Sequence, residues 1–370
     1  MKKTTLWIIV GIVVVIGIII AVSKKSPPTS GETIKIGANL ALTDFGASWA
    51  ENELKGAQLA VKEINNEGGV MGRPLQLVVE DNQSQSKGSV SATNKLISVD
   101  KVSFLLTGWS DQTEPVIPII SQNKVLTITV SAGAAGITKG SPYLFRTWPS
   151  DAIAVDALVK YAKEEGYKKV AIANSIGAWE ATLVESFKTL APQNGITVTD
   201  QVAFAMDVPD FKTQIAKLKA SAPDAIFIPI TSGPVERFVK QSGDLALNIP
   251  LLFPVDVTAI GVPEKAPASS LAYLTYATYA PSTEKFVAAY KKEYGVEPGV
   301  SADTAYDAVH MLAQAIEKAG TTDVEKVKES FSTWDGASGQ ITFDQDRDRS
   351  TAEVILMGFD GKTTTPVKLK

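Results

Sequence analysis

The sequence predicts an α/β protein of two lobes, each built on a doubly wound parallel sheet. From Thr33 onward, short β-rich runs alternate with amphipathic helical patterns, which is typical of βαβ units and therefore of parallel sheets. Nine or more strands over roughly 340 residues suit two such sheets better than one oversized sheet. The predicted strands are Ile34–Leu40, Leu75–Glu80, Val102–Thr107, Leu126–Val130, Val170–Asn174, Ile196–Val202, Ala225–Ile230, Leu251–Phe253 and Leu271–Tyr276.

Helical patterns lie between the strands and are expected to cover both faces of each sheet. Apolar residues recur in them with the period of an α-helix. The clearest predicted helices are Val155–Glu165, Ala181–Leu190, Phe211–Ala220, Phe286–Tyr294 and Ala302–Ala319.

The stretch from Gly56 to Ser84 shows how one helix–strand unit is built. Its helix has an apolar face formed by Leu54, Ala57, Val61 and Ile64. The pair Gly68-Gly69 follows, and glycine can adopt the positive φ that ends a helix. The apolar run Leu75–Val79 then predicts a buried strand. Open α/β sheets bind ligands beyond the carboxyl ends of such strands, so we expect a ligand site there.

The composition excludes several classes of protein. The net charge is −4, whereas nucleic-acid binding needs a basic surface. Without any cysteine, the chain has no disulfide framework, cysteine nucleophile or Cys/His zinc cluster. The single histidine, His310, is expected to be exposed or capping at the edge of an apolar helical face, and no Gly-x-Ser-x-Gly elbow occurs. Glycine motifs for phosphate or dinucleotide binding are also missing, so we predict neither an enzyme nor a bound cofactor.

One acidic run, Asp344–Arg349, has carboxylates at alternate positions, as calcium loops do. Such loops also need Gly at the sixth position and Glu at the twelfth, and this run has Arg349 and Ile355 there. We therefore predict a solvated turn at this point and no metal site.

Residues 1–32 are predicted to be an export segment followed by a tether. Residues 6–22 are apolar, which is longer than the ~7–15 residues of a typical signal-peptide core and shorter than the ~20 residues of a comfortable membrane span. Cleavage near Ala21-Val22-Ser23 and retention as a membrane anchor both remain open, while the absence of cysteine excludes a lipoprotein anchor. Export to the periplasm or the outer face of the cell membrane is expected in either case.

Two loops between predicted strands and helices are suited to bind an anionic group. The unpaired N–H groups and partial positive charge at the start of a helix favour an anion there. Gly108–Pro115 follows one strand and contains Ser110, which is also a natural helix N-cap. Ser131–Ala135 follows the next strand, and its small residues would let a ligand approach the backbone.

An ordered set of short motifs makes the chain resemble the type I solute-binding proteins of ABC transporters, in particular the leucine/isoleucine/valine-binding group. The resemblance covers roughly residues 34–359. It implies two flavodoxin-like lobes, joined by a three-strand hinge, with a ligand cleft between them. Lobe 1 would be residues 33–147 with 278–341, and lobe 2 would be residues 148–277 with 342–370. The motifs are Ile64-Asn65, Gly68-Gly69, Gly72-Arg73, Asp81, Lys95-Leu96-Ile97, Asp100-Lys101-Val102, Gly108, Phe145-Arg146-Thr147 and Pro149-Ser150-Asp151.

The same resemblance implies which residues bind the ligand. Ser110 would bind a ligand carboxylate, Trp49 would cover the ligand, and Asp256 would pair with its ammonium. Where the branched-chain pattern has a threonine, this chain has Ala135, and tyrosines common in the group are replaced near Trp179 and Thr231. These differences predict a pocket for another side chain. The full set of expected ligand-binding residues is Trp49, Ser110, Ser131, Gly133, Ala134, Ala135, Trp179, Thr231 and Asp256.

The function implied by the resemblance is that of a monomeric, exported binding protein. It would bind an amino acid or a similar small ligand by hinge closure and deliver it to the permease subunits of an ABC importer. A membrane-tethered ligand sensor that acts through a partner protein is the alternative.

Overall fold

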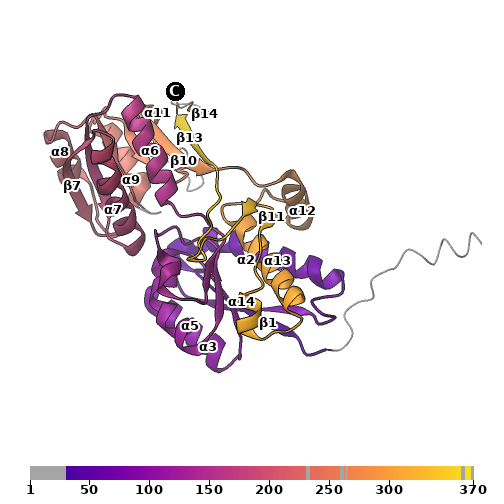
Figure 1. The fold of residues 1–370 in the computed structure, drawn as a ribbon. Coiled ribbons are helices and arrows are strands. Elements are labelled where there is room, and N and C mark those ends of the chain that lie inside the picture. Colours follow the sequence, from indigo (N-terminus) through magenta and orange to yellow (C-terminus); the bar gives the residue numbers. More distant parts are fainter. Residues whose placement is uncertain (1–30, 231–233, 259–261, 263–265, 360–362, 368–370) are drawn as a thin grey trace, which may run out of the picture.

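The computed structural model describes residues 31–230, 234–258, 262, 266–359 and 363–367, which form two α/β lobes side by side (Figure 1). Lobe 1 contains a parallel five-stranded sheet in the order β2-β1-β3-β4-β5. All residues of β3 and β4 are buried, as expected of central strands covered on both faces. The strands are β1 (Ile34–Leu40), β2 (Leu75–Asp81), β3 (Phe104–Thr107), β4 (Leu126–Thr129) and β5 (Leu144–Arg146).

Helices from two distant parts of the sequence cover this sheet. One face packs on α2 and α13, and the apolar cluster there joins Ile36 and Phe104 of the sheet to Ala57 and Leu312 of the helices. A methyl group on Gly56 would lie 1.9 Å from the Ala302 carbonyl oxygen, so glycine permits the close approach of the two helices. The helices of lobe 1 are α2 (Ala47–Asn66), α3 (Ser86–Ser98), α4 (Ser110–Thr113), α5 (Ile117–Asn123), α12 (Glu284–Tyr294), α13 (Ala302–Ala319) and α14 (Val324–Lys328).

Short elements complete lobe 1. Three single-turn 3-10 helices occur in its loops, and an antiparallel hairpin packs beside α13. These elements are η1 (Asp44–Gly46), η2 (Glu114–Val116), η3 (Ile137–Gly140), β11 (Trp334–Gly336) and β12 (Gly339–Ile341).

Lobe 2 contains a seven-stranded sheet in the order β14-β13-β10-β9-β8-β6-β7. Five neighbouring strands are parallel, whereas β13 and β14 run antiparallel at one edge. The strands are β6 (Lys169–Ser175), β7 (Thr197–Phe204), β8 (Ala225–Phe227), β9 (Leu251–Phe253), β10 (Leu274–Tyr279), β13 (Val354–Phe359) and β14 (Thr364–Pro366). The helices are α6 (Ala152–Glu164), α7 (Ala178–Gln193), α8 (Lys212–Ala220), α9 (Pro234–Asp244) and α11 (Ala268–Leu271).

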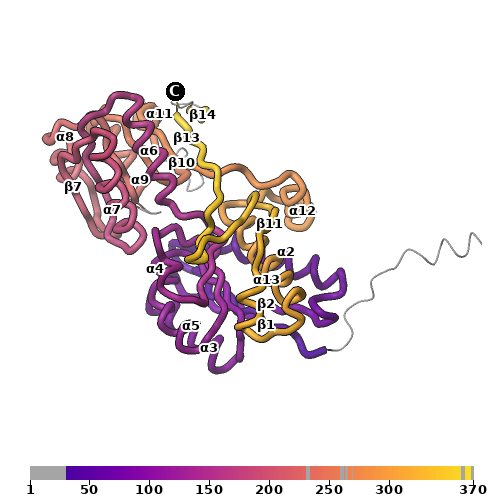
Figure 2. The backbone as a smooth tube through the Cα atoms, viewed as in Figure 1, coloured from indigo at the N-terminus to yellow at the C-terminus, as the bar shows by residue number. Residues whose placement is uncertain are grey.

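The chain crosses between the lobes three times, which Figure 2 shows as neighbouring segments of the backbone. The first crossing follows β5, the second follows β10, and the third joins β12 to β13. The expected two-lobed, flavodoxin-like architecture with a three-strand hinge is therefore confirmed. Among the described residues, no helix is both long and apolar enough to cross a membrane. The suggested anchor, residues 6–22, lies outside the described part of the chain.

Candidate ligand-binding cleft

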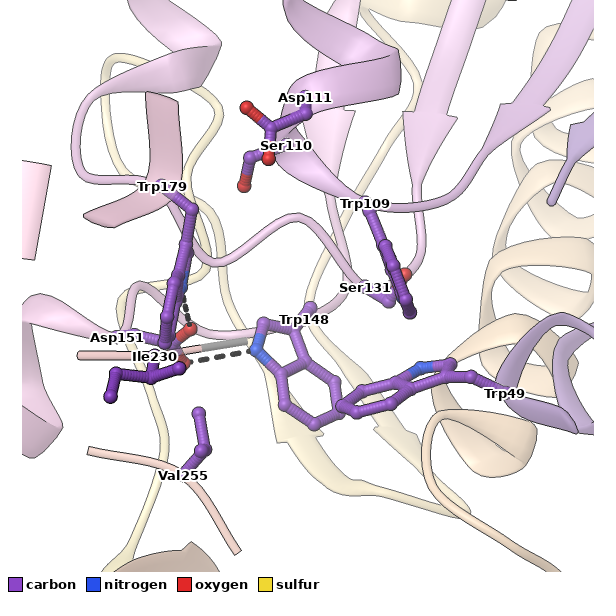
Figure 3. A pocket seen from close by; sticks show the side chains of 10 residues that line it. All are labelled: Trp49, Trp109, Ser110, Asp111, Ser131, Trp148, Asp151, Trp179, Ile230 and Val255. Atoms are coloured by element: carbon purple, nitrogen blue, oxygen red, sulfur yellow. Dashed lines mark hydrogen bonds between the residues drawn. The ribbon is translucent and has the colours of Figure 1, made fainter. Parts of the chain in front are cut away.

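Two adjoining cavities lie between the lobes, beside the crossings of the hinge. The first has a volume of about 570 Å³, including solvent at its mouth, and Figure 3 shows its walls. The second has about 1440 Å³ on the same basis. Both cavities are bordered by Trp49, Trp148, Asp151 and Val255, so they form one continuous cleft. The first cavity is lined by Trp49, Trp109, Ser110, Asp111, Ser131, Trp148, Asp151, Trp179, Ile230 and Val255.

Four of the ten residues that line the first cavity are tryptophans. Trp49 lies in the first turn of α2, and its ring centroid is 5.7 Å from that of Trp109 and 6.2 Å from that of Trp148. Trp179 lies in the first turn of α7, on lobe 2. In Figure 3, Trp179 and Trp109 stand on opposite sides of the cavity. Lobe 1, the first crossing and lobe 2 therefore each supply tryptophan to the same space.

Asp151 fixes the orientation of two of these rings. Its carboxylate accepts hydrogen bonds from Trp148 Nε1 at 3.1 Å, Trp179 Nε1 at 2.7 Å and the Tyr279 hydroxyl at 2.6 Å. The residue is only 3% exposed. Burial raises the pKa of Asp151 above its usual range, and the three hydrogen bonds act against that rise. The acidic residue thus holds the first crossing, α7 and β10 together at the floor of the cleft.

Gly133 makes room for this carboxylate. A methyl group at position 133 would lie 1.7 Å from Asp151 Oδ2 and 2.9 Å from Trp179 Nε1. The Gly133 carbonyl oxygen also accepts a hydrogen bond from the Asp151 N–H at 2.9 Å. Glycine is needed here because of space, since no larger residue fits without moving Asp151.

Hydrogen bonds across the cleft bring the two lobes into contact. The Ala178 N–H, at the start of α7, donates to Asp111 Oδ1 at 2.8 Å, and the Ala135 N–H donates to Thr182 Oγ1 at 3.2 Å. On lobe 1, the Ala134 N–H donates to Ser110 Oγ at 3.0 Å and joins the two loops that follow β3 and β4. The lobes are therefore in a closed arrangement on the side of the cleft that carries Ser110.

A buried acid lies behind the tryptophans. Glu53 on α2 is 1% exposed, and burial raises its pKa to about 7, although nearby hydroxyl groups of Ser131 and Ser301 lower it. Ser301 Oγ lies 3.2 Å from Glu53 Oε1 and 2.6 Å from Trp49 Nε1. Glu53 thus contacts the cleft indirectly, through the residue that holds the Trp49 indole.

The acidic run Asp344–Arg349 forms a turn, as the sequence predicted, with Asp344 and Gln345 exposed, but its last two residues contact the hinge. Arg146 is completely buried, and its guanidinium binds the Asp348 carboxylate with two hydrogen bonds, one of them 2.7 Å long from Nε. The same guanidinium donates to the carbonyl oxygens of Ala132 and Ala134. Arg349 is 8% exposed and donates to the Thr147 carbonyl oxygen at 2.9 Å. The end of the run therefore packs on the hinge, because Arg146 of the hinge and Arg349 of the run itself are both buried and both need hydrogen-bond acceptors.

The predicted ligand-binding residues do not all line the same cavity. Trp49, Ser110, Ser131 and Trp179 line the first cavity, and Gly133 lies behind its floor against Asp151. Ala134 and Ala135 border a smaller recess next to Ser110 instead. Asp256 lines the second cavity, where its carboxylate accepts hydrogen bonds from Thr258 and Thr278. Thr231 lies outside the described residues.

Six lining residues were not singled out from the sequence. Two of them, Trp109 and Asp111, flank Ser110 in the chain, and Asp151 belongs to a motif that was recognised only as part of the resemblance. Their position in the chain could have indicated them, because each follows a strand of a parallel sheet directly or after a few residues. The six are Trp109, Asp111, Trp148, Asp151, Ile230 and Val255.

The chemistry of the cleft suits binding. Among the described residues, no group of three or more His, Cys, Asp or Glu side chains could hold a metal ion. His310 lies elsewhere, on α13, where its ring stacks on Trp334 with centroids 5.9 Å apart. It is partly buried and was wrongly expected to be exposed or to cap a helix.

Comparisons with known proteins agree with this architecture. The periplasmic binding protein family model matches residues 33–363 of the chain. The Leu/Ile/Val-binding protein BraC3 of Rhizobium johnstonii is 29% identical over 347 residues, which cover 90% of this chain and 93% of that relative.

Two solved structures show the same fold. LivJ, a branched-chain amino acid transporter substrate-binding protein from Streptococcus pneumoniae in complex with isoleucine, superimposes with a TM-score of 0.78 at 26% identity, covering 91% of this chain and 99% of LivJ. An ABC transporter solute-binding protein from Rhodopseudomonas palustris, in complex with 3,4-dihydroxybenzoic acid, has a TM-score of 0.74 at 25% identity, covering 88% of this chain and 93% of that protein. These relatives are binding proteins, not enzymes, and the chain belongs to the periplasmic binding protein family.

Proposed function

We propose that this protein is the extracytoplasmic substrate-binding component of an ABC importer, which binds an amino acid or a similar small ligand between its lobes. The observation that carries the proposal is the cleft itself. Ser110 and Ser131 of lobe 1 face Trp179, Ile230 and Val255 of lobe 2 across one cavity, so a bound ligand would touch both lobes at once. Contacts of this kind stabilise the closed arrangement over the open one.

The ligand would be held by polar groups on one side and by charge on the other. Ser110, Ser131 and the loop Gly133–Ala135 are the proposed carboxylate site, with hydroxyl and backbone N–H groups as donors. Ser131 Oγ is buried beside Glu53, whose pKa its hydroxyl lowers, and Ser131 also lines the first cavity, where a ligand can reach it. Asp256 would attract the ligand ammonium from the second cavity, and Trp49 would cover the apolar part.

Delivery requires a second protein. The closed form, with residues 33–147 and 278–341 as one lobe and the remainder after residue 147 as the other, would dock on a membrane permease and release the ligand there. The relative named LivJ is a transporter substrate-binding protein bound to isoleucine, and this supports an amino acid as the first ligand to test.

Calorimetric titration tests this function. The full-length protein, unfolded and refolded to remove any carried-over ligand, is titrated with the twenty standard amino acids, their N-methylated derivatives, simple amines, and small amides and carboxylates. We expect saturable binding of at least one compound that has an ammonium group, without turnover. Folded protein that binds none of these compounds, or that converts one chemically, would contradict the proposal.

A further inference from the structure

The first cavity is unusually rich in tryptophan. Four of the six tryptophans in the chain, Trp49, Trp109, Trp148 and Trp179, line it. Figure 3 shows Trp109 and Trp179 almost edge-on at opposite sides, so a ring face of each is turned toward the space between them. The face of an indole carries a negative electrostatic potential and attracts cations more strongly than the rings of tyrosine or phenylalanine do.

Three of the four indole N–H groups are engaged by other side chains. Trp148 and Trp179 both donate to Asp151, and Trp49 donates to Ser301 at 2.6 Å. The cavity therefore meets ring faces and not hydrogen-bond donors on these walls. A carboxylate that accepts from an indole N–H also pushes electron density toward the ring, because neighbouring hydrogen bonds polarise one another.

The fixed charge of the cleft has one sign. Asp111 and Asp151 line the first cavity, and Asp256, Glu297 and Asp303 line the second. No lysine, arginine or histidine is present among the described residues that border either cavity. A ligand that carried only a negative charge would meet two nearby carboxylates without a compensating cation, which disfavours simple aromatic carboxylates here.

In the first cavity, several of the acceptors that the three N–H groups of a buried primary ammonium would need are already engaged. Both oxygens of Asp151 already accept hydrogen bonds from Trp148, Trp179 and Tyr279. Asp111 Oδ1 accepts from the Ala178 N–H at 2.8 Å. A quaternary nitrogen has no N–H to satisfy and needs only apolar surface with a negative potential, and the four indoles supply both.

We propose that the tryptophan cavity binds the quaternary ammonium group of a small N-methylated compound. The inference rests on the cleft proposed above as the ligand site and specifies its ligand class. The cation lies between the Trp109 and Trp179 faces, above Trp49 and Trp148. A ligand that also has a carboxylate reaches Ser110 and Ser131 with that group, on the side where Figure 3 shows Ser110.

Calorimetric titration with matched probes tests whether binding requires the positive charge of the ligand. Choline and glycine betaine carry the same trimethylammonium group, choline without a carboxylate and glycine betaine with one, and the neutral carbon isostere of choline has its shape without its charge. We expect at least one of the two ammonium compounds to bind. Its affinity should exceed that of its carbon isostere by about tenfold or more, the size of a desolvated cation–π interaction.

Substitutions of Trp109 distinguish the contribution of its π face to ligand affinity from that of its apolar surface. Trp109 has no side-chain hydrogen bond to a described residue, so replacing it removes only the ring. Along the series Trp109→Phe and Trp109→Leu, affinity for the ammonium probe should fall stepwise, by about tenfold in total. The same two substitutions at Trp334, which lies on β11 outside the cleft, should leave the affinity unchanged.

Four results would overturn the inference. Equal affinities for choline and its neutral isostere would show a merely apolar fit. Unchanged ammonium binding in a folded Trp109→Leu variant would exclude that ring. Binding of leucine or isoleucine without any binding of choline or glycine betaine would reject the ligand class and leave the proposed function standing. Failure of every amino acid, amine, amide and carboxylate would reject both.

Discussion

The Asp111 carboxylate of lobe 1 accepts a hydrogen bond from the Ala178 N–H of lobe 2, with 2.8 Å between Oδ1 and N. Ala178 begins α7, so the acid also lies at the positive end of a 16-residue helix. Like the hydrogen bond from the Ala135 N–H to Thr182, the contact joins the two lobes directly, and it can exist only while the cleft is closed.

Replacing Asp111 should shift the protein toward the open arrangement. In Asp111→Ala we expect a larger radius of gyration without ligand, measured by small-angle X-ray scattering, because an interlobe hydrogen bond is lost. Ligand affinity should fall by about 1 kcal/mol, the usual net contribution of such a bond. Asp335→Ala, on the exposed hairpin of lobe 1, is the matched control. Identical scattering and affinity in the two variants would show that the contact does not govern closure.

Gly133 should tolerate no larger side chain. The methyl group of Gly133→Ala would overlap Asp151 Oδ2, at 1.7 Å, and displace the carboxylate that orients Trp148 and Trp179. We expect ligand affinity to fall by at least about tenfold, measured by calorimetry. Gly358→Ala is the control, because its nearest neighbour would be a side-chain carbon of Val367 at 3.3 Å. Wild-type affinity in Gly133→Ala would mean that the loop Gly133–Ala135 can move to make room for the methyl group without displacing Asp151.

Asp256 should contribute to binding through its charge. Removing one member of a desolvated charge pair costs at least about 2 kcal/mol, so Asp256→Ala should weaken binding of an amino acid by roughly thirtyfold. Asp256→Asn, which keeps the shape, should lose nearly as much. Asp244→Ala, an exposed acid at the end of α9, should have no effect in the same titration. Unchanged affinity in both Asp256 variants would show that this residue does not pair with the ligand ammonium.

Glu53 should make stability fall as pH rises. Its pKa is about 7 in the folded protein and 4.5 when unperturbed, so between these values the folded state holds a proton that the unfolded state has lost. The free energy of unfolding should therefore decrease from pH 4.5 to 7, by about 3 kcal/mol from this residue alone. Chemical denaturation across that range measures the decrease.

Glu53→Gln provides the comparison for that experiment, because it keeps the size of the side chain and removes its ionisation. The difference in stability between the variant and the wild type should grow in favour of the variant as pH rises to 7, and should level off above it. A constant difference across the range would mean that Glu53 ionises at its ordinary pKa.

The buried guanidinium of Arg146 should depend on Asp348. Asp348→Ala leaves Arg146 without its anion, and breaking such a buried pair costs about 3–5 kcal/mol of unfolding free energy, measured by denaturation. The nearby Asp346 lies 3.7 Å from Lys139 at the surface, so Asp346→Ala should cost at most about 1 kcal/mol. Equal effects of the two substitutions would show that the Arg146 pair is as weak as a surface pair.

Regular elements of this fold could be predicted from local patterns. The strands Ile34–Leu40 and Leu251–Phe253 and the helix Ala302–Ala319 have the expected bounds, because their apolar periodicity is strong and uninterrupted. The strand expected at Leu271–Tyr276 begins instead at Leu274, since the residues before it form α11. The three-residue strand β5 was not predicted, because the charge of its buried Arg146 is paired with Asp348, 202 positions away.

The sequence predicted where the candidate site lies, but not which distant residues contact one another in it. Ser110 and Ser131 follow strands of a parallel sheet, which is a local signal. The role of Asp151 is not local, because its three hydrogen-bond donors come from the first crossing, α7 and β10. The same holds for Glu53, which reaches the Trp49 indole only through Ser301, 248 positions further along the chain.

The order in which the chain is synthesised has a consequence for lobe 1. Its sheet is complete at Arg146, yet the apolar cluster between that sheet and α2 also contains residues of α13, which ends at Ala319, and the Arg146 guanidinium pairs with Asp348. A nascent chain therefore cannot complete the packing of its first lobe until residues 302–348 have been synthesised, after the strands β6 to β10 of the second lobe. Contacts between such distant positions form slowly, because the intervening chain must first be ordered.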